Sequence, residues 1–226
     1  MTARTHDTGK SFILYDDALL DHADDTLFAP GTEAAGAGGR GSAWLAGGGE
    51  WVLRHYRRGG FAARLSADRY LWTGLGRSRP WREWRLLDFL YKAGLPVPQP
   101  VAARVLRTGL GYRGDLLTRR IRDAVSLAER LAGPAPGSVP WRALGACIRR
   151  FHDAGVWHAD LNAHNLLLDP QDRVYLIDFD RSGRRAPGRG WQLANLARLH
   201  RSLAKLGPLV PARGWAELMD GYRSGS

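Results

Sequence analysis

Residues 158–180 read "HADLNAHNLLLDPQDRVYLIDFD", and this stretch carries more polar chemistry than a folded core needs. Asp160 follows a histidine by two positions, Asn165 lies five residues further on, and Asp178 ends an apolar run. Buried carboxylates are costly unless they find partners. A divalent metal ion and a transferred phosphoryl group would use both carboxylates and the amide, so the segment indicates a site rather than a core.

The composition is that of a globular chain. It has 226 residues, 44% of them hydrophobic, with nine tryptophans, which allows one large domain or two small lobes. The single cysteine, Cys147, rules out an intramolecular disulfide framework and fits a reducing cytosol. The N-terminal apolar island is too short for a signal peptide, and no run approaches the roughly 18 apolar residues of a membrane span. We therefore expect a cytoplasmic protein, in a compartment that holds ATP.

The formal net charge of +11 comes almost entirely from arginine, because only Lys10, Lys92 and Lys205 are lysines. A solvated basic surface explains such a charge, and so does a polyanionic partner such as nucleic acid, phospholipid headgroups or a phosphorylated glycolipid. Helix-turn-helix, zinc-finger and RNP-type signatures are all absent from the sequence. We therefore expect no nucleic-acid partner. A solvated basic surface and a phospholipid or glycolipid partner both stay open as explanations of the charge.

The pattern of elements changes near residue 120. Before it, short β-prone runs alternate with glycine clusters, and one amphipathic segment (78–94) predicts a helix that Gly94 ends. Beyond it, helices are predicted over 124–133, 141–155 and 191–207, with short strands at "LLLD" and "VYLIDFD". The prediction is an α+β fold with a β-rich N-lobe (1–120) and a reduced, α-helical C-lobe (121–226) that carries the catalytic and metal-binding loops.

Two glycine-containing segments are candidates for a phosphate-binding loop. "TGKS" (8–11) lacks the first glycine of the G-x-x-x-x-G-K-[ST] pattern, because Arg4 stands there. "GAGGRG" places Gly36, Gly38 and Gly41 in a G-x-G-x-x-G pattern. A strand, a glycine turn and a second strand are predicted after it rather than a helix. That order is typical of protein kinases, in which backbone amides close over the phosphates of ATP.

The second of these strands, "WVLRHY", should then carry a cation for the α- and β-phosphates. Arg54 takes the position of the usual lysine, and the following helix offers Glu83 as its carboxylate partner. The sequence has no lysine between Lys10 and Lys92, so this is a departure from the kinase pattern. Arginine binds phosphate well but is not equivalent to lysine. The alternative to phosphate binding is that Arg54 is simply an exposed arginine on a strand.

The opening stretch resembles the H-R-D-x-x-x-x-N catalytic loop and the D-F-G metal motif of the protein-kinase-like fold. The resemblance implies that Asp160 accepts the proton of the substrate hydroxyl. It also implies that Asn165 and Asp178 hold the Mg²⁺ ions that bridge the phosphates of ATP. We expect His158 to pack and hydrogen-bond the loop, and His164 to be structural or to face the substrate.

Departures from the kinase pattern narrow the class of substrate. Ala159 replaces the arginine that grips a phosphorylated activation loop, and Asp180 replaces the glycine of D-F-G. Only twelve residues separate Asp178 from Trp191, and the A-P-E sequence is absent. Such a chain cannot build the usual platform for a peptide, so we expect no protein substrate. The pattern favours an unregulated kinase of small molecules or glycolipids.

Four longer segments identify a family: "LRHYRRGGFAARLSADRYLWTGL", "EWRLLDFLYKAGLPVPQPVAARV", "WHADLNAHNLLLD" and "LIDFDRS". Together they resemble the bacterial 3-deoxy-D-manno-octulosonic acid (Kdo) kinases, which belong with the lipopolysaccharide core kinases. The resemblance implies ATP-dependent phosphorylation of the 4-hydroxyl of Kdo on a lipid A precursor, at the cytoplasmic face of the inner membrane. Arg57, Arg58 and His164 are the candidate contacts to this acceptor.

A Kdo-lipid acceptor and an anionic bilayer would both suit a basic chain, since each cation near such a surface contributes about 1 kcal/mol. The basic runs that could meet them are Arg54, His55, Arg57, Arg58, Arg64 and Arg69, and again Arg181, Arg184, Arg185 and Arg189. Trp72 could lie at the interface or in the core. Two alternatives stay open: another kinase of this fold, acting on a heptose or an aminoglycoside, and a binding module that has lost catalysis.

Overall fold

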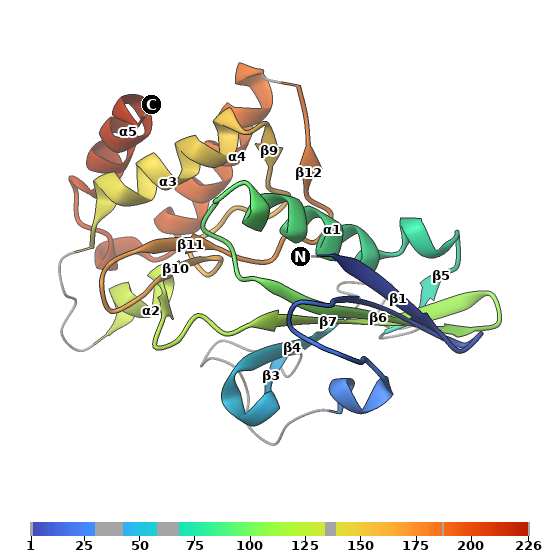
Figure 1. Ribbon diagram of the computed structural model, residues 1–226. Coiled ribbons are helices and arrows are strands. Elements are labelled where there is room, and N and C mark those ends of the chain that lie inside the picture. Colours follow the sequence, from blue (N-terminus) through green and yellow to red (C-terminus); the bar gives the residue numbers. More distant parts are fainter. Residues whose placement is uncertain (1, 30–42, 58–67, 134–138, 187, 226) are drawn as a thin grey trace. The chain divides into compact units, whose positions relative to one another are not determined.

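The computed structural model describes residues 2–29, 43–57, 68–133, 139–186 and 188–225. Within it the chain divides into two compact units. Unit 1 comprises Met1–Phe89 and Gln99–Arg120, and unit 2 comprises Leu90–Pro98 and Ile121–Ser226 (Figure 1). The helix α1 (Arg79–Lys92) runs from the first unit into the second. Each unit is described below by itself.

Unit 1 is built on one antiparallel sheet, which contains seven strands among the described residues. The strand order is β1-β2-β6-β7-β4-β3, and the short β5 also pairs with β7. The strands are β1 (Ala3–Asp7), β2 (Ser11–Asp16), β3 (Ala43–Ala46), β4 (Trp51–His55), β5 (Tyr70–Leu71), β6 (Pro100–Thr108) and β7 (Gly111–Arg119).

The two faces of this sheet differ, because successive side chains of a strand point to opposite faces. Leu53 lies in a buried cluster on one face with Ile13, Leu117 and Phe28, the last from the 3-10 turn η1 (Asp25–Phe28). Its neighbour Arg54 therefore points to the other face, and there it meets the helix α1. The side chains of β4 thus alternate between the two faces of the sheet, so that Arg54 contacts α1 while Leu53 packs in the core.

Close backbone approach fixes the start of α1 on the sheet. A Cβ on Gly114 of β7 would lie 2.3 Å from Cγ of Pro80, so only glycine permits this contact. The hydroxyl of Tyr112, also on β7, accepts a hydrogen bond of 3.0 Å from the backbone N–H of Arg79. Trp81 and Trp84 are buried along the helix. The helix is therefore seated on β7 in a fixed register.

Unit 2 is mostly helical. Its helices are α2 (Leu127–Ala132), α3 (Trp141–Asp153), α4 (Arg189–Ala204) and α5 (Gly214–Ser224). Its strands are short: β8 (Val125–Ser126), β9 (Val156–Trp157), β10 (Leu166–Leu168), β11 (Val174–Leu176) and β12 (Gly183–Arg184). They form one sheet in the order β11-β10-β8 and a second pair, β12-β9.

The pairing of α3 with α5 depends on glycine. A Cβ on Gly145 of α3 would lie 1.9 Å from the carbonyl oxygen of Leu218, and one on Gly221 of α5 would lie 2.0 Å from that of Arg142. Both distances are far inside van der Waals contact, so the two backbones touch directly. In Figure 1 the two helices lie side by side.

The expected α+β fold is confirmed, with local corrections. The helix expected over 124–133 begins only at Leu127, because Ser126 forms a capping box with Glu129 and joins β8. The strand expected at "VYLIDFD" ends at Leu176. The helix α5 was not predicted. Among the described residues, no helix has the length and apolar character that crossing a membrane requires.

Candidate active site

The loop that follows β9 is held by a buried histidine, as expected for His158. Its side chain is 2% exposed, and its Nε2 lies 3.0 Å from the carbonyl oxygen of Ile177. The backbone N–H of Asp160 donates to its Nδ1 at 3.1 Å. Burial lowers the pKa of His158 below its ordinary value, so the ring is neutral and Nε2 carries the proton. His158 therefore joins the loop to the segment that leads into Asp178.

Strand pairing brings Asn165 and Asp178 to the same end of a two-strand ladder. Leu166 of β10 faces Leu176 of β11, and the ladder continues when Ile177 N–H donates to the carbonyl oxygen of Asn165 at 3.0 Å. Asn165 thus lies just before one strand and Asp178 just after the other. Residues 13 apart in the sequence become neighbours through the hairpin.

Phe179 anchors the turn that carries Asp178. It is 1% exposed, and its ring lies 4.9 Å from that of His158 and 5.8 Å from that of Phe151 on α3. Asp178 has a φ of 61° and Arg181 a φ of 59°. Non-glycine residues rarely adopt this left-handed conformation, and such strain gathers at functional sites. The buried phenylalanine between them holds the turn in place.

Asp160 presents its carboxylate at the surface with a contact on each oxygen. Oδ1 lies 2.9 Å from Nη1 of Arg198, and Oδ2 accepts from Nδ2 of Asn162 at 3.0 Å. About half of each partner of the ion pair is exposed: 49% of the Arg198 side chain and 56% of the Asp160 side chain. Asp160 is therefore oriented but open to solvent, as a base that meets an external substrate must be.

One face of α4 supports the whole loop, and the sequence reading missed it. The side-chain amide of Asn195 donates to the carbonyl oxygen of His158 at 2.8 Å and accepts from its N–H at 3.1 Å. Ser202 Oγ accepts from the N–H of Ala163 at 3.1 Å. With Arg198, these residues follow an i, i+3, i+7 spacing, which places them on one helix face. A polar triplet at that spacing within an amphipathic helix was the available signal.

Unit 1 contributes the expected pair of Arg54 and Glu83. Glu83 is 3% exposed, and its Oε2 is hydrogen-bonded to Nη2 of Arg54 and to the hydroxyl of Tyr56, the latter at 2.6 Å. The guanidinium also lies 4.7 Å from the centre of the Tyr56 ring. Burial, together with the Glu83 carboxylate, holds the pKa of Tyr56 well above its ordinary value, so it stays a donor. Tyr56 was not anticipated as part of this cluster.

The remaining candidates divide into exposed residues and residues that lie outside the described ranges. Arg57 and His164 are exposed, and the backbone N–H of His164 donates to Oδ1 of Asn162 at 2.8 Å. The glycines of the predicted phosphate loop and one of the two candidate acceptor arginines fall outside the described residues: Gly36, Gly38, Gly41 and Arg58.

The donor set of unit 2 fits a magnesium ion bound to a nucleotide. Nδ2 of Asn165 donates to the carbonyl oxygen of Asp160 at 2.9 Å, which leaves its oxygen as the atom that can bind a cation. Asp178 adds a carboxylate. Within the described ranges no cluster of three or more His, Cys, Asp or Glu gathers into a metal cage. Magnesium needs none, since it is commonly held by one or two carboxylates together with substrate phosphates and water.

Comparison with known proteins gives the family. The model of the lipopolysaccharide kinase (Kdo/WaaP) family matches residues 31–222. The chain belongs to this lipopolysaccharide kinase family. Its relatives include the 3-deoxy-D-manno-octulosonic acid kinases of Xanthomonas axonopodis pv. citri (strain 306), with 52% identity, and of Stenotrophomonas maltophilia (strain K279a), with 49% identity. Each alignment covers 205 residues, which is 88% of this chain and 82% of the relative.

A solved structure supports the same fold for this lipopolysaccharide kinase-family chain. It is described as WaaP in complex with acyl carrier protein, and it superposes with a TM-score of 0.55 at 18% identity. The superposition covers 84% of this chain and 78% of the other. At that identity the likeness shows the fold alone. The resemblance found from the sequence motifs is thus confirmed at the level of family and fold.

Proposed function

We propose that the chain transfers the γ-phosphoryl group of ATP to the 4-hydroxyl of a Kdo residue carried on a lipid A precursor, a step of lipopolysaccharide core assembly. The observation that carries the proposal is the arrangement of Asp160, Asn165 and Asp178 in one loop-and-hairpin unit. Relatives about half identical over most of the chain bear the name of Kdo kinase, which supports this acceptor.

Asp160 is the group that meets the attacking hydroxyl. Its carboxylate accepts the proton from the sugar oxygen, while Asn162 and Arg198 keep its two oxygens in a fixed direction. Transfer of a phosphoryl group depends mainly on positioning and on stabilisation of charge. Holding the base from both sides is therefore worth more than raising its basicity.

Asn165 and Asp178 are the proposed magnesium ligands. The amide oxygen of Asn165 and the carboxylate of Asp178 would hold the ion, which when bound neutralises charge on the nucleotide phosphates. His158 and Asn195 act behind them by fixing the backbone on which these ligands are mounted. Removing either supporting residue would therefore disturb the ligands without touching the metal.

Arg54 is the proposed phosphate-binding cation of unit 1. The buried carboxylate of Glu83 fixes one side of its guanidinium, and the Tyr56 ring lies against it. A planar guanidinium presents several donors in a fixed fork, a geometry that suits a phosphate group. We further propose that Gly36, Gly38 and Gly41 cover the phosphates, and that units 1 and 2 are the N-lobe and C-lobe of the kinase fold.

The acceptor and the location complete the proposal. Arg57, Arg58 and His164 would contact the anionic sugar and its lipid-borne phosphates. The net charge of +11 suits an acceptor held in an anionic bilayer. We therefore propose that the protein works as a peripheral protein on the cytoplasmic face of the inner membrane.

The test is phosphoryl transfer from [γ-³²P]ATP and Mg²⁺ to a panel of purified acceptors: Kdo-bearing lipid A precursor, the same precursor without Kdo, a heptosylated core glycolipid and an aminoglycoside. The proposal requires label in the Kdo-bearing lipid, with the phosphate located on the 4-oxygen by NMR. Label only in the heptose or aminoglycoside acceptor would replace the substrate. ATP binding without transfer to any acceptor would indicate a binding module instead.

A further inference from the structure

The β6–β7 turn ends in an apolar tip. Thr108 and Gly111 close the hairpin, Gly109 turns it with a φ of 59°, and Leu110 takes the outermost position. Leu110 is 85% exposed, and Leu71 of β5, which pairs with Gly111, is 67% exposed. These are the two most exposed large hydrophobic side chains among the described residues. Figure 1 shows the β6–β7 turn and β5 at the same end of the sheet of unit 1.

The tip is held rigidly rather than as a loose loop. The backbone N–H of Trp72 donates to the carbonyl oxygen of Leu110 at 2.9 Å, which ties the strand β5 to the turn. The Trp72 ring is stacked on Phe12 at 6.0 Å and lies 6.1 Å from Tyr112 in an edge-on geometry. Two leucines are therefore presented to solvent on a fixed aromatic base.

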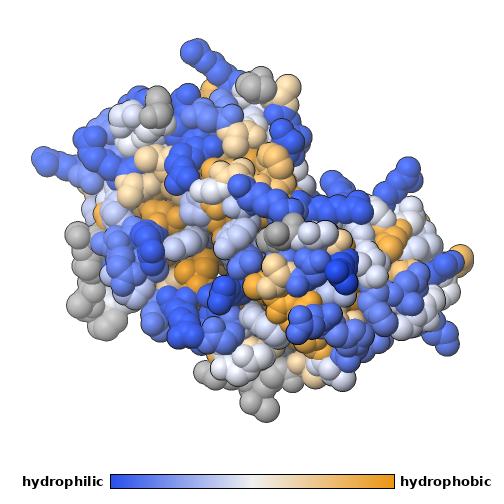
Figure 2. Space-filling view, in the orientation of Figure 1, coloured by the Kyte–Doolittle hydropathy of each residue, from blue (hydrophilic) through white to orange (hydrophobic). Residues whose placement is uncertain are grey.

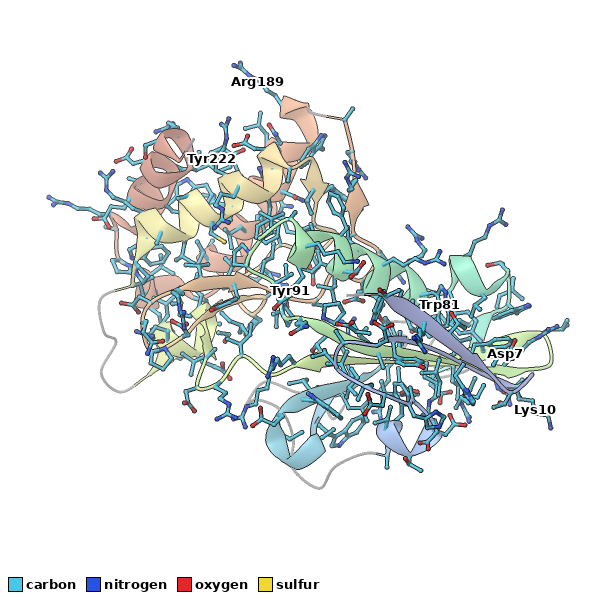
Figure 3. The ribbon with its side chains drawn as sticks, in the orientation of Figure 1. Asp7, Lys10, Trp81, Tyr91, Arg189 and Tyr222 are labelled. Atoms are coloured by element: carbon cyan, nitrogen blue, oxygen red, sulfur yellow. The ribbon has the colours of Figure 1, made fainter. Side chains whose placement is uncertain are left out.

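Cations surround this apolar tip. The guanidinium of Arg107 lies 5.1 Å from the centre of the Trp72 ring, and the backbone N–H of Arg107 donates to the carbonyl oxygen of Lys10 at 2.8 Å. Figure 3 shows Lys10 reaching outward from the β1–β2 turn. Four cations, Lys10, Arg69, Arg107 and Arg113, stand here against two acids, Asp7 and Asp68, and Asp68 is paired with Arg113 at 2.7 Å.

We propose that this tip, formed by Leu71, Leu110 and Trp72 with Lys10 and Arg107, docks unit 1 onto an anionic lipid bilayer. The leucines enter the boundary between headgroups and acyl chains, Trp72 lies at headgroup level, and the cations meet lipid phosphates. Figure 2 shows hydrophobic surface at this end of unit 1, bordered by hydrophilic residues. The inference rests on the proposed function in one respect, that a lipid-linked acceptor requires an enzyme at a membrane.

The shape of the tip favours a bilayer over a protein partner. A stable protein interface buries about 800 Å² on each side, and its centre is a broad packed surface. Leu110 in the hairpin turn and Leu71 on the paired strand β5 offer a narrow apolar surface instead, with positive charge beside it. Insertion of a few apolar side chains together with an electrostatic contact is the way in which peripheral proteins bind anionic membranes.

The first experiment places a fluorophore on the tip. Cys147 is the single cysteine, it is buried, and burial raises the pKa of its thiol to about 12, so it stays unreactive. A Leu110→Cys variant therefore takes one environment-sensitive label. Leu193→Cys is the matched control, because Leu193 lies on α4 of unit 2 and is 60% exposed. Both proteins are mixed with vesicles of phosphatidylglycerol and phosphatidylethanolamine, or of phosphatidylcholine alone.

We expect the label at 110, and not the label at 193, to shift to the blue with the anionic vesicles, and to shift little with phosphatidylcholine. In co-sedimentation with the same vesicles, the double variant Leu71→Ser/Leu110→Ser should bind about a hundredfold more weakly than the wild type, and Leu193→Ser unchanged. The double variant Lys10→Glu/Arg107→Glu should bind anionic vesicles about tenfold or more weakly than the wild type, with no change in its binding to phosphatidylcholine vesicles.

An unshifted label at 110 on vesicles that bind the protein, or equal loss in the Leu193→Ser control, would overturn the proposal. So would a failure of the wild type to bind anionic vesicles. Phosphorylation of a Kdo-bearing saccharide without acyl chains is measured on the same proteins. The tip variants should keep that activity, whereas a wild type that phosphorylates neither this saccharide nor the Kdo-bearing lipid would contradict the proposed function and leave the vesicle result to be judged separately.

Discussion

Replacing Asn195 by leucine tests how much this residue stabilises the loop that carries Asp160, separately from the catalytic role proposed for that loop. The amide of Asn195 satisfies both the N–H and the carbonyl oxygen of His158, a residue that is 2% exposed. Each buried backbone group left without a partner costs about 1–3 kcal/mol. The free energy of unfolding should therefore fall by about 2–6 kcal/mol, against a total of about 5–15 kcal/mol for a typical protein.

Two neighbours on the same helix face provide matched controls. Ser202→Ala leaves the N–H of the buried residue Ala163 without its partner and should cost about 1–3 kcal/mol. Arg198→Ala breaks an exposed ion pair and should cost about 0–1 kcal/mol. Activity should not follow the same order, because Arg198 orients Asp160 directly and its loss lowers kcat far more than it lowers stability.

The assay is urea unfolding followed by circular dichroism, with kcat and KM measured well below the midpoint of each variant. The reasoning requires Asn195→Leu to be the least stable of the three and Arg198→Ala to show the largest loss of kcat per unit of lost stability. If Asn195→Leu unfolds at the same urea concentration as Arg198→Ala, the side-chain amide of Asn195 does not contribute the free energy of unfolding that its two hydrogen bonds imply.

Three further predictions concern other parts of the molecule. Arg54→Glu should raise the KM for ATP steeply while Arg57→Glu raises it little, because Arg54 alone of the two is fixed by Glu83; equal effects in steady-state kinetics would remove Arg54 from the phosphate site. The hydrogen bond to Asp115, at 2.7 Å, raises the pKa of His55 above its ordinary value, so its stabilisation is fully present below about pH 6.5 and is lost as the pH rises through the raised pKa. The wild type should therefore exceed His55→Gln in stability more at pH 6 than at pH 9 in urea titrations, and a pH-independent gap would contradict this. Gly145→Ala should abolish or severely lower thermal stability because its Cβ would lie 1.9 Å from the Leu218 carbonyl oxygen, whereas Gly190→Ala, with nothing within 4 Å, should leave the melting temperature unchanged or slightly higher.

The sequence was sufficient for the parts of the site that lie close together in the chain. The short sequence spacings from His158 to Asp160 and Asn165, and the apolar strand before Asp178, could be recognised directly in the sequence. Strand pairing does bring Asn165 and Asp178 together. Arg54 and Glu83 could be matched because one is on a strand and the other on the following helix. Their ion pair is present, and their role in phosphate binding stays a prediction.

Features that depend on register or on distant packing could not be predicted in the same way. The pattern of α4 predicts a helix, but which polar residue faces the loop depends on how the helix is rotated against β9, so Asn195 was missed. The helix α5 was overlooked because two of its four buried residues, Gly214 and Gly221, are glycines, so only Leu218 and Tyr222 mark its packed face in the sequence. Leu71 and Leu110 are exposed because they lie where the pairing of β5 with β7 ends, and the local sequence does not show where that pairing ends.

The central claim is that Asn165 and Asp178 hold the metal–nucleotide complex while Asp160 serves the acceptor. Electron paramagnetic resonance of Mn²⁺, used in place of Mg²⁺ with a non-hydrolysable ATP analogue, measures that division directly. Asp178→Asn and Asn165→Ala should each weaken retention of the Mn²⁺–nucleotide complex by at least about tenfold. Asp160→Asn should retain it like the wild type and yet lose phosphoryl transfer by about a hundredfold or more. Retention of Mn²⁺ by Asp178→Asn at the wild-type affinity would contradict the claim.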